Sequence, residues 1–222
     1  QGRQAMAAIR KRTGQHGAPL DVLIVGAGPA GISAGLSAIH HKLRYAIIEQ
    51  EDGLGGAVYH YPRNKIAMTA PVKLDLVGPM RLGSEVQKEK LLEFWNGVVE
   101  KTGLTVQFEE QFLGMTSRTD GSFDVKTSRG EYHTRSVLLA MGRRGTPRKL
   151  GVPGEDEPNV VYRLVDPQQY RGKSVLVVGG GDSALEAAIA LAEEPDTTAW
   201  LSYRGNAFSR VKQKNRERLA AL

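Results

Sequence analysis

Short apolar runs alternate along this chain with stretches of helical periodicity. Four runs have the near-continuous apolar character of strands buried on both faces of a parallel sheet; they cover residues 21–25, 45–48, 137–140 and 174–178. A fifth strand is expected at residues 198–202. Helices are expected over residues 32–39, 88–101 and 183–193. This alternation predicts an α/β fold with parallel strands.

The region from residue 105 to residue 133 has a different pattern, in which short strands are separated by turn residues. Strands are expected at residues 105–108, 112–117, 123–127 and 131–133. Asp120-Gly121 and Arg129-Gly130 are typical of hairpin turns. This region therefore predicts a set of hairpins between the first parallel strands and the strand at residues 137–140.

Two glycine signatures, Gly26 to Gly31 and Gly179 to Ala184, each follow an apolar run and precede a helical stretch of small residues. In such a turn the first glycine permits the tight change of direction, the second lets a pyrophosphate approach the backbone, and the third position lets the helix pack closely on the strand. The sequence therefore predicts two dinucleotide sites. The expected contact residues are Gly26, Gly28, Pro29, Ala30 and Gly31 in the first site and Gly179, Gly181, Asp182, Ser183 and Ala184 in the second.

The residue that follows each second strand indicates which nucleotide each site takes. Glu49 stands 23 residues after Gly26 (49 − 26), where an acidic side chain binds the ribose hydroxyls; a surface glutamate is the alternative. The matching position of the second module is Ser202, followed by Tyr203 and Arg204, so no carboxylate stands there. A carboxylate would repel a 2′-phosphate, whereas an arginine can bind it, so we expect NADP, with Arg204 as first choice and Arg210 as second; solvated surface arginines are the alternative.

Composition limits the possible chemistry and location. The chain of 222 residues has no cysteine, which excludes disulfides, thiolate metal sites and a dithiol centre within it and suits the cytoplasm. Residues 22–39 carry no charge, but glycines and a proline at their centre favour a strand, a turn and a helix over a membrane span. The adjacent His40-His41 pair favours capping over metal binding, so no metal is expected.

The net charge of +6 is concentrated at the two ends of the chain. Residues 1–20 hold four basic and no acidic residues, and residues 204–222 hold six basic and one acidic, so the ends contribute +9 and the middle −3. This distribution is not the continuous stripe of a nucleic-acid-binding protein. The basic ends suit a phosphate or an acidic partner protein, with solvated helix faces as the alternative.

The two motifs together resemble the two-dinucleotide-binding flavoproteins of the thioredoxin-reductase type, over about residues 20–210. Further marks are Glu49, Gly55-Gly56, Ala140-Met141-Gly142 and Gly172-Lys173. The resemblance implies FAD on the first module and NADPH on the second. It also implies that Gly55 and Gly56 lie near the flavin side of the FAD site and that Ala140 and Gly142 belong to a turn that closes over FAD.

Three departures from that family refine the prediction. Residues 162–166 (Tyr-Arg-Leu-Val-Asp) stand where a thioredoxin reductase carries Cys-x-x-Cys-Asp, which favours the cysteine-free ferredoxin–NADP reductase branch; Asp166 is interpreted as a turn former before Pro167. The family's pair of arginines is here Arg204 followed by Gly205. The family's final FAD-binding segment is not found before residue 222, so the C-terminal FAD segment is expected to be missing from this chain.

The sequence thus predicts two Rossmann-like dinucleotide-binding domains: residues 1–20 as a linker or tag remnant, 21–156 as the FAD-binding domain and 157–222 as an incomplete NAD(P)-binding domain. The predicted function is a cytoplasmic oxidoreductase that passes hydride from NADPH to FAD and on to a ferredoxin-like protein, a quinone or a small molecule. An acidic acceptor protein and a second copy of the chain are the candidate partners. The alternative is a non-catalytic module that binds a dinucleotide as a ligand or sensor.

Overall fold

The computed structural model of the chain describes residues 1–12, 20–63, 65–142, 147–205 and 208–222. These residues divide into two compact units, Gln1–Thr146 and Pro147–Leu222. The division lies ten residues before the expected domain boundary (156 − 146). Each unit contains one of the two glycine signatures, in agreement with the predicted α/β class.

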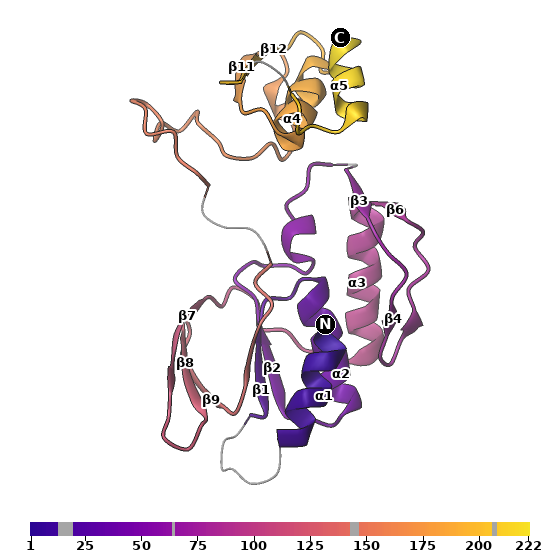
Figure 1. Cartoon of the computed structure of the whole chain (residues 1–222), viewed down its shortest axis with the longest axis vertical. Helices are drawn as coiled ribbons and strands as arrows, with labels where there is room; N and C mark the ends of the chain where they lie inside the picture. The colour runs from indigo at the N-terminus through magenta and orange to yellow at the C-terminus, as the bar shows by residue number, and fades with distance from the viewer. Residues whose placement is uncertain (13–19, 64, 143–146, 206–207) are drawn as a thin grey trace. The chain divides into compact units, whose positions relative to one another are not determined.

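The first unit is built around a parallel sheet of three strands in the order β10-β1-β2 (Figure 1). The strands are β1 (Val22–Val25), β2 (Tyr45–Ile48) and β10 (Val137–Leu139). Val22 and Ile24 face a core formed with the helices, whereas Leu23 and Val25 face a second core with Val125. Both faces of β1 are therefore buried, which explains why its sequence is apolar without alternation.

Helices cover one face of this sheet and a second sheet covers the other (Figure 1). The second sheet is antiparallel, with the order β7-β8-β9. Two small antiparallel pairs, β3 with β6 and β4 with β5, complete the unit. The bounds are α2 (Pro29–His40), η1 (Gly56–Val58), β3 (Ile66–Met68), β4 (Lys73–Leu74), β5 (Gly78–Pro79), β6 (Glu85–Gln87), α3 (Lys88–Thr102), β7 (Phe112–Ser117), β8 (Phe123–Thr127) and β9 (Glu131–Thr134).

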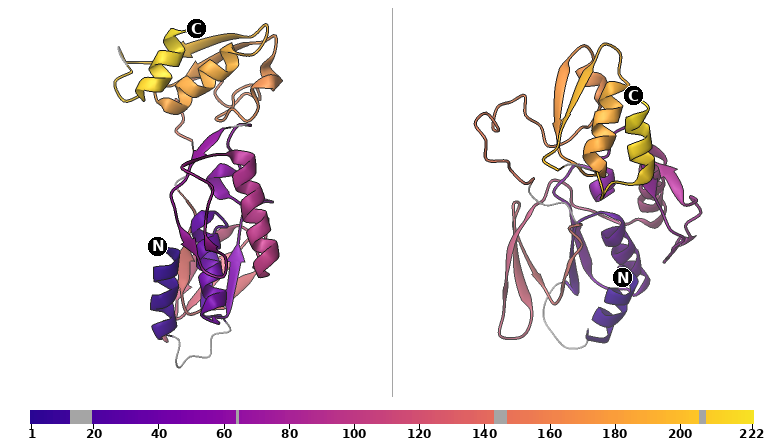
Figure 2. Two further views of the ribbon diagram at one scale, coloured as in Figure 1. Left: turned by 90° about the vertical axis from the view of Figure 1, so that its right-hand side faces the viewer. Right: turned by 45° about the horizontal axis from the view of Figure 1, so that its top comes forward.

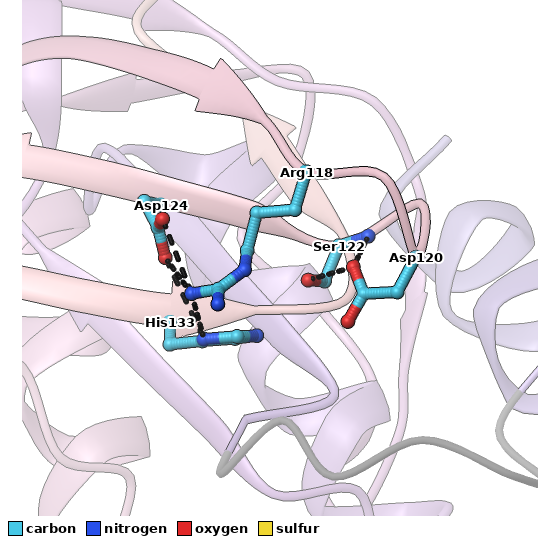
Figure 3. A network of polar contacts seen from close by, with 5 residues as sticks. All are labelled: Arg118, Asp120, Ser122, Asp124 and His133. Atoms are coloured by element: carbon cyan, nitrogen blue, oxygen red, sulfur yellow. Dashed lines mark hydrogen bonds and ion pairs between the residues drawn. The ribbon is translucent and has the colours of Figure 1, made fainter.

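The hairpin between β7 and β8 turns at Asp120-Gly121, as the sequence predicts (Figure 3). The Asp120 carboxylate accepts hydrogen bonds from the backbone N–H of Ser122 (2.9 Å) and from its hydroxyl (2.6 Å), and the hydroxyl bond is the main cause that lowers the pKa of Asp120. Beside the turn, Arg118 Nη1 lies 3.1 Å from Asp124 Oδ1 and 3.1 Å from His133 Nδ1. The expected strand at residues 105–108 is reduced to a single bridge, Ile48 to Gln107.

The first residues of the chain differ from the expected linker, because residues 2–12 form helix α1 (Gly2–Arg12) against α2. Met6 is fully buried in the core of the unit, and a Cβ on Gly2 would lie 2.9 Å from the backbone N of Ala34. Helices α1 and α2 therefore approach each other so closely at Gly2 that glycine is required there. Residues 13–19 of the expected linker lie outside the described residues.

The second unit contains a parallel pair of strands, β11 (Ser174–Val178) and β12 (Thr198–Ser202), joined through α4 (Asp182–Ala192). Helix α4, orange in Figure 2, covers one face of the pair, and α5 (Gln213–Ala220) packs along α4. The short helix η2 (Pro167–Tyr170) precedes β11, and Asp166 caps it by accepting a hydrogen bond from Gln168 N–H, which confirms its interpretation as a turn former. Sequence periodicity missed α5, which is polar except at Leu219 and Ala220.

A buried carboxylate that precedes β7 in the first unit gives a prediction about alkaline stability. Glu110 is 5% exposed and accepts hydrogen bonds from the hydroxyls of Thr127 (2.6 Å) and Tyr132 (3.0 Å). The burial of Tyr132 is the larger cause, and its hydrogen bond to Glu110 the second, that together raise the pKa of Tyr132 to about 12. The folded state therefore holds the Tyr132 hydroxyl proton more tightly than the unfolded state, in which the pKa of a tyrosine is about 10. The contribution of the protonated Tyr132 to folding stability is complete below pH 10 and is lost as the pH rises from about 10 through about 12.

We therefore expect the free energy of unfolding to fall more steeply between pH 9.5 and pH 12 in the wild type than in Tyr132→Phe. Urea unfolding at several pH values measures this difference, and the rise of tyrosinate absorbance locates the titration. Equal slopes for the two proteins would contradict the assignment of this titration to Tyr132.

Candidate functional site

The first glycine turn connects the end of β1 to the start of α2, and each of its glycines meets a different constraint. Gly26 has a φ of +106°, and a Cβ there would lie 2.5 Å from Ala140 O. A Cβ on Gly31 would lie 1.8 Å from Gly26 O. Gly26 and Gly31 therefore serve the turn and the close approach of strand and helix.

Gly28 differs from these two glycines because its surroundings leave room for a side chain. A Cβ there would meet only the Gly56 backbone, Cα at 3.7 Å and N at 4.0 Å, which are ordinary contact distances, and the backbone angles (φ −73°, ψ −179°) suit any residue. Gly28 is the N-cap of α2, has no side-chain cap, and is followed by exposed Pro29 and Ala30. No acidic side chain lies in the first turn of α2, so its N-terminal N–H groups are available to an anion.

Other segments that the sequence singled out meet at this turn. Gly55 N–H donates to Ala27 O (3.2 Å), and a Cβ on Gly56 would lie 3.2 Å from Gly28 Cα. Ala140 N–H donates to Val25 O (2.8 Å), which places Ala140 at the end of β1 beside Gly26. Gly142 follows with φ +73° and open space at its Cβ position.

Glu49 is 6% exposed at the end of β2, and its carboxylate points at the glycine turn. Oε2 accepts a hydrogen bond from Ala27 N–H (2.7 Å) and Oε1 accepts one from Glu51 N–H (3.1 Å). A carboxylate has about four acceptor positions, so both oxygens retain lone pairs for further donors. The sequence alone did not predict that Glu49 also braces the backbone of the turn.

The second glycine turn connects β11 to α4. Gly179 has a φ of +150°, and a Cβ there would lie 3.0 Å from Ala184 Cβ, so the strand and helix approach closely at this pair. Gly181 is the N-cap of α4 without a side-chain cap, and a Cβ there would meet nothing within 4 Å. Ser183, between Gly181 and Ala184, lies in the first turn of α4. Gly181 therefore corresponds to Gly28 of the first turn, because neighbouring atoms leave room at its Cβ position.

Asp182 is the one acidic residue in the first turn of α4, and its side chain is engaged with the start of α5. Its Oδ1 accepts hydrogen bonds from Lys212 N–H (2.9 Å) and from the Asn215 amide (2.8 Å). The backbone bond from Lys212 is the main cause that lowers the pKa of Asp182. The predicted site residue Asp182 thus fastens α5 to α4, a contact that no local sequence pattern indicates.

Exposed basic residues follow β12 in the second unit. Arg204 lies between Tyr203 and Gly205, and Arg210 precedes the buried Val211. Asn206 and Ala207, part of the segment that departs from the family pattern, lie outside the described residues. The sequence analysis did not single out Tyr203, whose ring lies against Gly180. Gly180 stands between the first two glycines of the motif, where any residue is allowed, so a glycine at that position was the one sequence signal of this contact.

Among the residues that the structure describes, no helix is long and apolar enough to cross a bilayer. Two units, each with a glycine turn between a parallel strand and a helix, define a protein of the Rossmann-like α/β class. Residues 23–222 match the family described as pyridine nucleotide-disulphide oxidoreductase, and the chain belongs to this family.

Individual relatives agree with this assignment. The chain is 33% identical over 177 residues to a ferredoxin–NADP reductase of Ignicoccus hospitalis, covering 78% of this chain and 53% of that protein. It is 30% identical over 192 residues to the bacilliredoxin reductase Bdr of Bacillus subtilis, covering 84% of this chain and 58% of that protein. The chain thus spans little more than half the length of these relatives.

Solved structures confirm the fold. The bacillithiol disulfide reductase Bdr of Staphylococcus aureus has a TM-score of 0.79 at 25% identity, covering 90% of this chain and 62% of that one. The thioredoxin reductase of Lactococcus lactis has a TM-score of 0.65 at 24% identity, covering 90% and 60%. The predicted relationship to flavoproteins of the thioredoxin-reductase type is therefore confirmed.

Proposed function

We propose that this protein is a FAD-dependent oxidoreductase that takes reducing equivalents from NADPH and passes them to a separate acceptor. The first unit would hold FAD and the second NADPH. The observation that carries this proposal is the pair of open glycines, Gly28 and Gly181, each at the N-terminus of a helix that starts directly after a strand. The names of the relatives, ferredoxin–NADP reductase and bacilliredoxin reductase, support the same reaction class.

The residues of the first turn fit a dinucleotide. The diphosphate would meet the backbone at Gly28, Pro29 and Ala30, where Gly28 and Ala30 offer N–H groups and Pro29 offers none. The helix dipole favours an anion there, and the first turn of α2 has no acidic side chain. Glu49 would accept hydrogen bonds from the ribose hydroxyls on its remaining lone pairs. Gly55, Gly56, Ala140 and Gly142 would border the nucleotide without side chains that obstruct it.

The fit of the second turn to NADPH has the same basis. A diphosphate would approach Gly181, because its Cβ position is open, and the Asp182 carboxylate is directed to Lys212 and Asn215. These hydrogen bonds offset part of the repulsion between Asp182 and a phosphate. Ser183 and Ala184 complete the first turn of the helix that receives it.

The flavin supplies the redox chemistry when bound, by accepting a hydride and releasing its electrons to the acceptor. The chain contributes position and electrostatics, and no acid or base side chain is required. Because the chain has no cysteine, no thiol of this chain relays electrons. The candidate acceptors are a ferredoxin-like protein, a quinone, a disulfide protein and a small molecule. The basic residues near the C-terminus favour an acidic protein.

Anaerobic titration of the full-length protein tests the proposal. The purified protein is expected to be yellow, and its flavin band is expected to bleach on addition of NADPH. A colourless protein, or a flavin band that does not respond, would instead support the non-catalytic module. A cytoplasmic location and a homodimer remain predictions, which fractionation and analytical ultracentrifugation check.

Arg204 is predicted to select NADPH over NADH, with Arg210 as the second contact. Arg204→Ala is expected to raise the KM for NADPH about 10-fold to 100-fold, because a charge-assisted pair contributes about 1.5–3 kcal/mol. The KM for NADH should change less than about 2-fold. Arg216→Ala, which removes an exposed charge from α5 of the same unit, is the control, and a wild type that reacts faster with NADH would contradict the assignment.

A further inference from the structure

Tyr203 follows β12 directly, and its ring occupies space that two glycines leave free. A Cβ on Gly180 would lie 2.1 Å from both Cδ2 and Cε2 of the ring. A Cβ on Gly205 would lie 2.7 Å from Cε1 and 2.8 Å from the hydroxyl oxygen. Any side chain at either position would displace the ring, so Gly180 and Gly205 together form its seat.

A second aromatic ring completes the contacts of Tyr203. Phe208 stacks on it with the ring centroids 5.3 Å apart and the planes at 19°. The offset-stacked arrangement is a favourable one for aromatic pairs. Tyr203 is nevertheless 38% exposed, so the ring is held by these contacts at the surface of the unit beside the glycine turn.

The chain beyond Phe208 is fastened to the same turn. Asp182 Oδ1 accepts the hydrogen bonds from Lys212 N–H and the Asn215 amide, and Asn215 also donates to Glu186 Oε1 (3.2 Å). Both ends of the segment that carries Arg204 and Arg210 are therefore attached to the strand-turn-helix that begins α4.

We infer that Tyr203 is a positioning residue for dinucleotide selection: seated between Gly180 and Gly205, it holds Arg204 in the orientation that receives the 2′-phosphate of NADPH. This inference rests on the proposed function of the second unit. Arg204 lies between Tyr203 and Gly205 in the chain. The Tyr203 ring lies against Gly180 of the turn, and Gly205 lies against the same ring, so the contacts of both neighbours limit the directions that the Arg204 side chain takes. A pre-ordered arginine binds phosphate without the cost of ordering its backbone first.

Binding of 2′,5′-ADP to the full-length protein, measured by calorimetry, tests the inference without dependence on flavin or turnover. Tyr203→Ala is expected to weaken 2′,5′-ADP about 10-fold and 5′-ADP less than 2-fold, whereas Tyr203→Phe, which keeps the ring, should bind like the wild type. Gly180→Ala displaces the Tyr203 ring without removing any side chain of the segment, and it should reproduce the effect of Tyr203→Ala.

Kinetics gives a second measurement: Tyr203→Ala should raise the KM for NADPH about 10-fold with little change in kcat or in the KM for NADH. Equal losses for 2′,5′-ADP and 5′-ADP, or wild-type binding by Tyr203→Ala and Gly180→Ala, would overturn the inference while leaving the proposed function intact. If Tyr203→Ala does not fold, the Gly180→Ala result decides. A wild type that binds neither NADPH nor 2′,5′-ADP would overturn the proposed function and this inference together.

Discussion

Gly28→Ala is expected to weaken FAD binding at least about 100-fold, or about 2.7 kcal/mol, in a protein that stays folded. The new methyl group would meet only the Gly56 backbone, at 3.7 Å or more, and the backbone angles of Gly28 suit alanine. In the proposed site, the same methyl group would stand where the diphosphate of FAD approaches the start of α2. We expect the unfolding free energy of the flavin-free protein to change by about 1 kcal/mol or less.

FAD fluorescence titration and the flavin content of the purified protein measure this effect. Gly97→Ala is a matched control, because Gly97 is exposed in the interior of α3 with nothing within 4 Å of its Cβ position. It should leave FAD binding unchanged and stabilise the helix by about 0.5–1 kcal/mol. Wild-type FAD affinity in Gly28→Ala would contradict the proposal that this turn binds the diphosphate of FAD.

Gly31→Ala is expected to have the opposite signature, a loss of about 3 kcal/mol or more of folding stability in the first unit. Its Cβ would lie 1.8 Å from Gly26 O and 3.0 Å from Gly26 C, and both are backbone atoms that cannot turn aside. The strand and helix must therefore separate, which disturbs the buried contacts of Ile32 and Ala34.

The two tryptophans of the chain separate the response of one unit from that of the other. Trp95 is buried in the first unit, and Trp200 is exposed in the second. In a Trp200→Phe background, tryptophan fluorescence during urea unfolding reports on the first unit alone. Gly28→Ala in the same background is the control, and equal midpoints for Gly31→Ala and Gly28→Ala would show that the close approach at Gly31 is not a constraint.

The strands and helices next to the two glycine signatures could be predicted because their signals are local. β1 is apolar without alternation since both its faces are buried, and α3 shows helical spacing up to Gly103, whose φ of +67° ends the helix. α1 and α5 were not predicted, because residues 1–20 were interpreted as a linker or tag remnant and α5 has few apolar residues. Their positions depend on contacts with α2 and α4.

The sequence by itself determined the two strand-turn-helix modules, because glycine at a tight turn and apolar residues in a buried strand are requirements of the local backbone. It also predicted Glu49, directly after β2, and Arg204, shortly after the end of β12, as nucleotide contacts. The signature assigned each glycine a role by its position, but only the tertiary structure showed the contacts behind these roles: at Gly26 and Gly31 neighbouring backbone fills the Cβ position, whereas at Gly28 and Gly181 the position is open. The engagement of Asp182 with α5 and the seat of Tyr203 also required the tertiary structure, because they join residues through space that no spacing in the sequence relates.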